Sequence, residues 1–357
     1  MAHALGLGRR GLGRCWPNPA VGCVIVRDGI VVGRGWTQPG GRPHAEAVAL
    51  AQAGAAARGA TAYVTLEPCA HHGKTPPCAD ALVAAGVARV VVALGDPDHR
   101  VNGAGLARMR AAGIEVVEGV GAEAARADQA GFLSRVTKGR PMVTLKLASS
   151  FDGRIATASG ESQWITGPEA RRAVHGLRLR HDAVMVGGGT ARADDPALTV
   201  RDMGARHQPV RVVLSRHLDI PLDGRLAATA REVPLWLLHG DRVDPARATA
   251  WAERGAARFE VPVSGGRLDP APALEILGQQ GITRVFCEGG GGLGASLIGA
   301  GLVDELVGFT AGLALGAEGR PSLAAMGIDA LAGAPRFGLV EARAVGGDVM
   351  HRWRRLG

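Results

Sequence analysis

The sequence predicts an α/β protein built from two domains. The chain has 357 residues, which is more than one hydrophobic core usually organises. β-branched runs alternate with helical stretches along its length, and this order favours sheets with helices packed on them. The polar stretch TKGRP, at residues 137–141, closes the first alternating series before MVTLKLA begins a new strand. We therefore expect one domain over residues 1–139 and another over residues 140–357.

A hairpin begins the first series. The run AVGCVIVRDGIVVGRGW places Asp28 and Gly29 between two β-branched strands, and a DG pair of this kind is typical of a tight turn. The elements expected after it are a helix from Pro43 to about Gly54, a strand at 61–66, a helix from about Cys78, a strand at 89–94, a helix at about 102–112 and a strand at 114–119. This order predicts a mixed or parallel sheet.

The second series has the same rhythm, but its sequence does not repeat the first. The expected elements are a strand at 142–148, a helix from Pro168 to about Arg180, strands at 182–187, 210–215, 233–239 and 283–288, and a helix from about Gly294. Because no internal repeat relates the halves, we expect two different domains joined in one chain.

Composition and charge indicate an ordinary soluble globular protein. Hydrophobic residues make up 46% of the chain, and the five cysteines are too few and too unevenly spaced for a disulfide framework. No apolar run approaches the roughly 18 residues of a membrane span, and the N-terminus lacks the features of a signal peptide, so the cytoplasm is the expected location. The net charge of +8 would suit nucleic acid, but the basic residues are dispersed. An arginine-rich surface or an anionic small ligand is the alternative explanation of this net positive charge. We expect no nucleic-acid or membrane partner.

Three residues of the first half have the chemistry of zinc ligands. His44 stands at a helix start, Cys69 follows a strand, and Cys78 begins a helix after a Pro-Pro pair. One imidazole and two thiols leave a fourth position for water, which is typical of a catalytic site, and we expect one Zn²⁺ per chain. His71 or His72 in the intervening loop offers a fourth protein ligand instead, although contact with substrate or solvent is the other interpretation.

Glu46 is the expected proton acceptor beside this metal. Two thiolates offset the zinc charge and leave its water a weaker acid, so a neighbouring carboxylate is needed to take the proton. His-x-Glu followed by Pro-Cys and a second Cys is typical of zinc-dependent cytidine-type deaminases. Eight residues, AHHGKTPP, separate Cys69 from Cys78 in place of the usual two, and they bring Lys74 to the site, which suits an anionic substrate.

Longer motifs carry a resemblance to a known family. TLEPCAHHGKTPPC, together with PNPAVGCVIV and PHAE, resembles the deaminase half of the bifunctional riboflavin-biosynthesis deaminase/reductase family. KLASSFDGRIATASGESQWITGPEAR and TARADDPALTVR resemble its reductase half, so nearly the whole chain is covered. The resemblance implies a cytidine-deaminase-like three-layer domain fused to a dihydrofolate-reductase-like domain, and a homo-oligomer, either dimer or tetramer. Phe151 and Trp16 depart from the commoner residues of these motifs.

The resemblance also implies two successive reactions. The first is zinc-hydroxide deamination of 2,5-diamino-6-(5-phosphoribosylamino)pyrimidin-4-one, with Glu46 shuttling the proton. The second is NADPH reduction of the ribosyl group of 5-amino-6-(5-phosphoribosylamino)uracil to ribityl. No residue is identified as an obligatory proton donor in the reduction step. Asp194 could serve, but contact with the cofactor ribose is the preferred interpretation of this residue.

Site residues follow from the same motifs. The cofactor-binding residues that the resemblance implies are Ser149, Trp164, Thr190, Asp194, Ser215, Gly290, Gly291, Gly292, Leu293, Gly294, Ala295 and Ser296. The substrate-binding residues it implies are Asn18, Lys74, Ser162, Arg178, Leu198, Arg201 and Glu288, with the arginines reaching a phosphate. Without this context, Trp164 is interpreted as a core residue and Arg178 as a surface helix residue.

Several alternatives remain open from the residues themselves. EGGGGLGAS has the Gly-x-Gly-x-x-Gly spacing of a Rossmann turn at Gly289, Gly291 and Gly294. The acidic residue that a Rossmann site needs about 20 positions further on is missing. A tight turn without a ligand is the other interpretation. A nucleic-acid or nucleoside deaminase with a C-terminal binding module is the rival function. Aromatic residues at 4% of the chain are too few for base-stacking platforms. A third alternative, one non-catalytic half, disagrees with the intact motifs of both halves.

Overall fold

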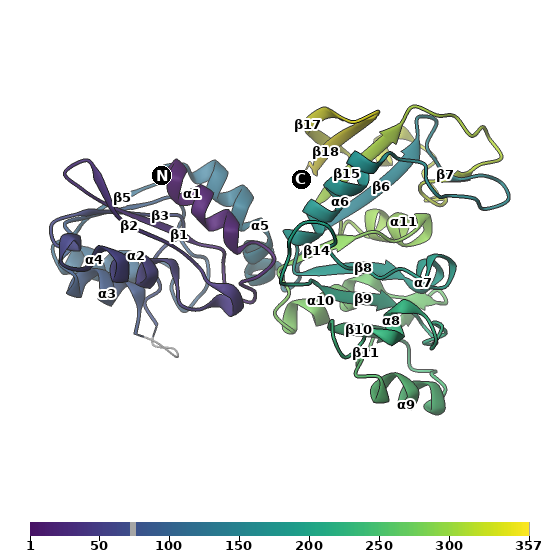
Figure 1. Cartoon of the computed structure of the whole chain (residues 1–357), viewed down its shortest axis with the longest axis horizontal. Coiled ribbons are helices and arrows are strands. Elements are labelled where there is room, and N and C mark those ends of the chain that lie inside the picture. Colours follow the sequence, from purple (N-terminus) through teal and green to yellow (C-terminus); the bar gives the residue numbers. More distant parts are fainter. Residues whose placement is uncertain (72–75, 357) are drawn as a thin grey trace. The chain divides into compact units, whose positions relative to one another are not determined.

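The computed structural model describes residues 1–71 and 76–356, and the chain divides into two units, Met1–Arg140 and Pro141–Gly357. The boundary expected at Gly139 lies next to this division. Gly139 adopts the left-handed conformation, with φ of 69°, and thereby ends helix α5 (Ala122–Lys138). Each unit has its own main sheet (Figure 1).

The first unit contains a sheet in the order β2-β1-β3-β4-β5. Asp28 and Gly29 have φ values of 50° and 78° and join β1 to β2 in the tight turn that the DG pair predicts. β3 pairs antiparallel with β1 but parallel with β4, so the sheet is mixed, as expected. The strands are β1 (Gly22–Arg27), β2 (Ile30–Trp36), β3 (Thr61–Val64), β4 (Arg89–Val92) and β5 (Glu115–Glu118).

Helices cover both faces of this sheet and make three layers (Figure 1). Alternate residues of β1 point to opposite faces: Ile25 belongs to the core beneath α2, α3 and α4, whereas Val24 packs against α1. A Cβ atom at Gly35 would lie 2.0 Å from the Ala45 carbonyl oxygen, so glycine is required for α2 to lie this close to β2. The helices are α1 (Ala2–Gly8), α2 (Ala45–Ala53), α3 (Cys78–Ala84), α4 (Ala104–Ala111) and α5.

The second unit is built on a sheet in the order β11-β10-β9-β8-β14-β6-β15-β18-β17. Its pairings are parallel from β11 to β15, and β18 and β17 complete the sheet as antiparallel strands. The strands are β6 (Met142–Ser150), β8 (Ala183–Gly187), β9 (Val210–Leu214), β10 (Leu235–His239), β11 (Ala257–Glu260), β14 (Arg284–Cys287), β15 (Glu305–Ala311), β17 (Phe337–Val345) and β18 (Asp348–Arg355). Short strands β7 (Arg154–Ala156) and β16 (Arg320–Pro321) pair with each other, as do β12 (Val263–Ser264) and β13 (Arg267–Leu268).

The prediction for the last helix was wrong at its start. α11 begins at Gly291 rather than about Gly294, because Gly290 takes the extended N-cap conformation and its carbonyl oxygen accepts the Gly294 N–H at 3.1 Å. Most of the glycine-rich stretch, which was expected to be a loop, therefore forms the first turns of a helix. The helices of this unit are α6 (Pro168–Leu179), α7 (Gly188–Asp194), α8 (Arg225–Ala228), α9 (Pro245–Glu253), α10 (Pro270–Gln279) and α11 (Gly291–Gly299). Among the described residues, no helix combines the length and the apolar character that crossing a membrane requires.

A buried histidine makes the second unit sensitive to acid. His181 Nδ1 lies 2.7 Å from the Leu177 carbonyl oxygen and Nε2 lies 2.9 Å from Thr144 Oγ1, contacts that a neutral ring satisfies. Burial lowers the pKa of His181 to about 3.

We expect the free energy of unfolding to fall as the pH drops below about 6.5, because the unfolded chain then binds a proton that the folded ring excludes. Between about pH 6.5 and pH 3 the loss from this group should approach about 1.4 kcal/mol per pH unit. His181→Asn should lose this part of the pH dependence in denaturant unfolding curves. Parallel pH profiles for parent and variant would contradict the assignment.

Candidate functional site

The expected zinc ligands of the first unit come from three different elements and meet at one point. His44 is the N-cap of α2, Cys69 follows β3, and Cys78 is the first residue of α3. One ligand atom from each residue lies within 4.8 Å of the others. Because the segments after β3 and before α2 and α3 share one edge of the sheet, residues far apart in sequence become neighbours.

The separations suit a tetrahedral metal ion. His44 Nδ1 lies 3.4 Å from Cys78 Sγ and 3.7 Å from Cys69 Sγ. Zinc bonds of about 2.3 Å to sulfur and about 2.0 Å to nitrogen place such atoms about 3.6 Å apart. A hydrogen bond between the thiols lowers the pKa of Cys69 to about 4 and raises the pKa of Cys78, so a metal bound here displaces a proton from Cys78.

Glu46 and Asn18 complete the surroundings of this cluster. Burial raises the pKa of the Glu46 carboxyl to about 7, and the Cys69 charge adds to this, whereas His44 and a hydrogen bond with Cys78 oppose it. Asn18 Nδ2 donates to the Gly41 carbonyl oxygen at 2.7 Å and lies 3.4 Å from His44 Nε2. Asn18 therefore lies beside Nε2, the ring nitrogen opposite the one that faces the thiols. Lys74 lies outside the described residues.

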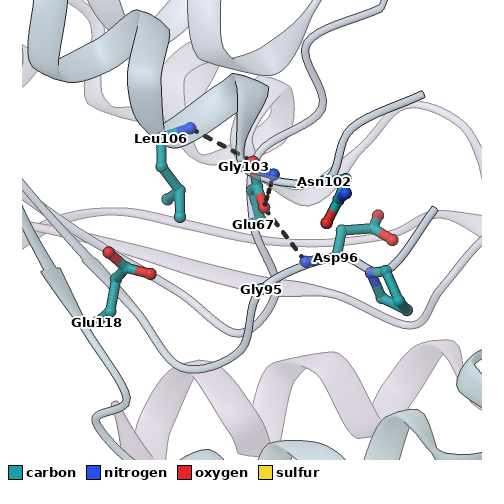
Figure 2. Close-up of a pocket in the computed structure, with 8 residues that line it drawn as sticks. Glu67, Gly95, Asp96, Asn102, Gly103, Leu106 and Glu118 are labelled. Atoms are coloured by element: carbon teal, nitrogen blue, oxygen red, sulfur yellow. Dashed lines mark hydrogen bonds between the residues drawn. The ribbon is translucent and has the colours of Figure 1, made fainter. Parts of the chain in front are cut away.

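A cleft of about 350 Å³ opens where β3, β4 and β5 end, and its lining includes side chains that sequence reasoning missed. Figure 2 shows Glu67 pointing toward the start of α4, with Glu118 on another side of the cleft. Burial raises the pKa of Asp96 to about 6, and the charges of Asp98 and Glu67 contribute. The signal was the stretch GDPDHRVNG, which gathers acidic and turn residues directly after a strand.

The expected cofactor residues of the second unit lie where parallel strands end. Ser149 is the second-last residue of β6, Ser215 follows β9, and Gly290 follows β14. Thr190 and Asp194 belong to α7, directly after β8. Thr190 Oγ1 accepts the Gly290 N–H at 3.1 Å and so joins two of these loops. The crevice outside the carboxyl ends of parallel strands is where open α/β sheets bind ligands.

The glycine-rich start of α11 has room on one side and close packing on the other. A Cβ atom at Gly291 would lie 3.1 Å from the Ser322 carbonyl oxygen, whereas one at Gly292 would meet nothing within 4 Å. Leu293 contacts the Cβ position of Gly289, and Ala295 is buried. The main-chain N–H groups at the start of such a helix suit a pyrophosphate.

A largely buried ion pair lies among the expected substrate residues. Arg178 Nε donates to Glu288 Oε1 at 2.5 Å, Nη2 donates to Oε2 at 3.1 Å, and Nη1 donates to the Thr199 carbonyl oxygen at 2.7 Å. Lys146 on β6, which sequence reasoning did not name, is half-buried; burial lowers its pKa, and the charges of Glu288 and Asp194 oppose that shift. A lysine inside the otherwise apolar strand MVTLKLA was the signal that pointed to it.

The remaining expected residues differ in accessibility. Trp164 is 66% exposed, and the Arg171 guanidinium carbon lies 4.7 Å from the centre of its ring, so the indole is not a core residue. Leu198 is buried in the core beside β8 and β9, so its side chain is withdrawn from solvent. The Arg201 N–H donates to His175 Nδ1 at 3.2 Å, and the arginine is exposed. Ser162 lies between β7 and α6.

Ser215 has a carboxylate neighbour. Its hydroxyl donates to Asp219 Oδ1 at 2.7 Å, and Arg192 pairs with the other oxygen of Asp219 at 2.6 Å. Hydroxyl, guanidinium and carboxylate therefore meet directly after β9.

Models of two families match the chain. The description "Cytidine and deoxycytidylate deaminase zinc-binding region" matches residues 1–94, and "RibD C-terminal domain" matches residues 141–351. The first match includes His44, Glu46, Cys69 and Cys78.

Similar proteins extend over nearly the full length. "Riboflavin biosynthesis protein RibD" of Escherichia coli is 44% identical, with 98% of this chain and 96% of the relative covered. The protein of the same name from Aquifex aeolicus is 40% identical, with 90% of both chains covered. A solved structure of Acinetobacter baumannii RibD is 39% identical with a TM-score of 0.88, and 99% of this chain and 97% of that one are covered. A deaminase/reductase structure from Thermotoga maritima is 34% identical with a TM-score of 0.86, and covers 100% of this chain and 97% of its own.

The ion pair between Arg178 and Glu288 predicts a non-additive effect on stability. Arg178→Met leaves a carboxylate in a site where both side chains are 13% exposed or less, and we expect a loss of about 3–5 kcal/mol in the free energy of unfolding. Adding Glu288→Gln in the same chain should recover most of it, because the uncompensated charge is then gone. Denaturant unfolding of the single and double variants measures both changes, and equal stability of the two would contradict this account.

Proposed function

Because the chain belongs to the RibD family of riboflavin-biosynthesis proteins, we propose that its two units catalyse two consecutive steps on one phosphorylated pyrimidine. It is a bifunctional deaminase and reductase. The first unit removes an amino group from 2,5-diamino-6-(5-phosphoribosylamino)pyrimidin-4-one. The second reduces the ribosyl group of the product to ribityl.

One observation carries the first assignment: the cluster of His44 Nδ1, Cys69 Sγ and Cys78 Sγ beside the buried Glu46. These three atoms would hold one Zn²⁺ per chain and leave a position for water. A bound zinc ion supplies a Lewis acid that lowers the pKa of that water. Asn18, which lies beside the other ring nitrogen of His44, remains a proposed substrate contact.

Glu46 moves the proton in this proposal. Its carboxylate takes a proton from the attacking water and gives it to the departing amino group at C2 of the pyrimidine, which leaves as ammonia. Burial of this carboxyl favours its neutral form, which suits a group that takes a proton from water and then returns it.

In the second unit the proposed role of the chain's residues is to bind and orient the cofactor and the substrate. NADPH supplies a hydride when bound, and Ser149, Thr190, Ser215 and the start of α11 would hold it at the common edge of the strands. Trp164 and Asp194 remain proposed contacts of the cofactor, and Ser162 and Leu198 remain proposed contacts of the substrate. Arg178 and Arg201 would bind the substrate phosphate, with Glu288 fixing the Arg178 guanidinium. A homo-oligomer also stays a prediction.

The proposal is tested by supplying the purified chain with the diaminopyrimidine phosphate and NADPH. We expect ammonia release followed by loss of nicotinamide absorbance. With the already deaminated substrate, absorbance should fall without ammonia. Ammonia release with no later absorbance change would contradict the second assignment, and the reverse would contradict the first.

Cys78→Ala should abolish stoichiometric zinc binding, because two ligands remain where three are needed. Elemental analysis of the purified variant measures the zinc content per chain. Cys287→Ala, a matched change of a buried cysteine in the second unit, should keep the parental content. Undiminished zinc in Cys78→Ala would show that the metal is bound elsewhere.

Glu46→Gln should keep zinc and lose deamination, because the amide preserves shape but does not accept the proton. Ammonia release should fall by about 10²–10⁴-fold. Reduction of the deaminated substrate by the same preparation serves as the control and should continue at the parental rate. A fall in ammonia release of less than about tenfold would rule out the shuttle.

A further inference from the structure

Glu67 ties three segments of the first unit together through one buried carboxylate. Its side chain is in the cleft wall, and the residue is only 4% exposed. Oε1 accepts the N–H groups of Gly105 at 3.0 Å and Leu106 at 3.4 Å; Oε2 accepts those of Gly103 at 3.1 Å and Asp96 at 3.3 Å. The bonds drawn in Figure 2 connect Glu67 to the start of α4 and to the loop after β4.

The start of α4 is shaped to receive this carboxylate. Gly103, the N-cap, has φ of 88°, a conformation that favours glycine. A Cβ atom at Gly105 would lie 2.1 Å from the Pro68 carbonyl oxygen, so only glycine lets the helix approach this close. A negative charge is stabilised at a helix N-terminus by the exposed N–H groups and the helix dipole.

The same segment holds the Cys69 thiol. The Glu67 N–H donates to the Leu94 carbonyl oxygen at 2.8 Å, which fixes the main chain against the end of β4. Two residues later, the Cys69 carbonyl oxygen accepts the Ala79 N–H at 3.2 Å, and its Sγ accepts the Cys78 N–H at 3.3 Å. Cys69 therefore lies between two anchors, α3 on one side and the Glu67 carboxylate on the other.

We propose that Glu67 is a positioning residue for deamination, whose carboxylate fixes the Pro68–Cys69 segment against α4 and so sets the place of the Cys69 sulfur in the metal site. The inference rests on the proposed zinc site. It predicts that loosening Glu67 changes the geometry and strength of metal binding, and does not merely lower the stability of the unit.

The test replaces Zn²⁺ by Co²⁺ in the full-length chain and compares parent with Glu67→Gln. The amide turns an N–H donor toward the N–H donors of α4, so about half of the hydrogen bonds are lost and the segment shifts. We expect displaced thiolate-to-cobalt and ligand-field absorption bands, and release of Zn²⁺ to a chelator that is faster by about 10–100-fold, the usual effect of removing a group that orients a metal ligand. Glu118→Gln is the matched control, because Glu118 lines the same cleft but pairs with Arg110 at the surface.

Parental bands and a parental release rate in folded Glu67→Gln would overturn the proposal and leave Glu67 a structural residue. If Glu67→Gln does not fold, Glu67→Asp takes its place; it keeps both acceptors but is shorter, so the bands should shift, and unchanged bands would overturn the proposal equally. Absence of thiolate-to-cobalt bands in the parent would instead contradict the zinc site itself. Reduction of the deaminated substrate should be the same in every variant.

Discussion

Parallel pairing of strands is the constraint on which both candidate sites depend. Parallel neighbours end at the same edge of a sheet, so the segments that follow them are brought together whatever their distance in sequence. In the first unit this edge collects Cys69 after β3 and the Asp96 loop after β4. In the second it collects Ser149 at the end of β6, Ser215 after β9 and Gly290 after β14. The antiparallel strands extend each sheet but contribute none of these residues.

The N-termini of helices lie near these strand ends and produce a positive electrostatic potential there. His44 caps α2, the Glu67 carboxylate lies at the start of α4, and the glycine-rich stretch opens α11. Unpaired N–H groups at these ends stabilise negative charge, whether on a carboxylate or on a phosphate. The glycines at 35, 105 and 291 let helices and main chain approach closely enough for that effect to operate.

The secondary structure predicted from the sequence agrees best with the observed structure where one short sequence pattern determines the local conformation. The DG turn, the helix beginning at Cys78 and the strands around them required only local signals. The exposed edge strand β17 was missed, because its burial pattern lacks the alternation that marks a half-buried strand. α11 was placed late, because a run of glycines resembles a loop until Gly290 is seen to cap a helix. Glu67 was beyond local reasoning, since its partners lie about 30–40 residues away and are main-chain groups.

The ion pair between Arg178 and Glu288 explains how a guanidinium that we propose as a phosphate ligand is held before any phosphate binds. A buried guanidinium without a partner would lose hydration and gain nothing until substrate arrived, a cost that the Glu288 pair removes. The pair also fixes the plane of the Arg178 fork, because two of its nitrogens are held by Glu288 and a third by the Thr199 carbonyl oxygen. The N–H groups of the fork that remain are then held in set directions, and they are the groups that the proposed phosphate contact would use. Because Glu288 already offsets the Arg178 charge, net attraction for the proposed phosphate would have to come from neighbouring cations, of which Arg201 is exposed and Lys146 is half-buried on β6.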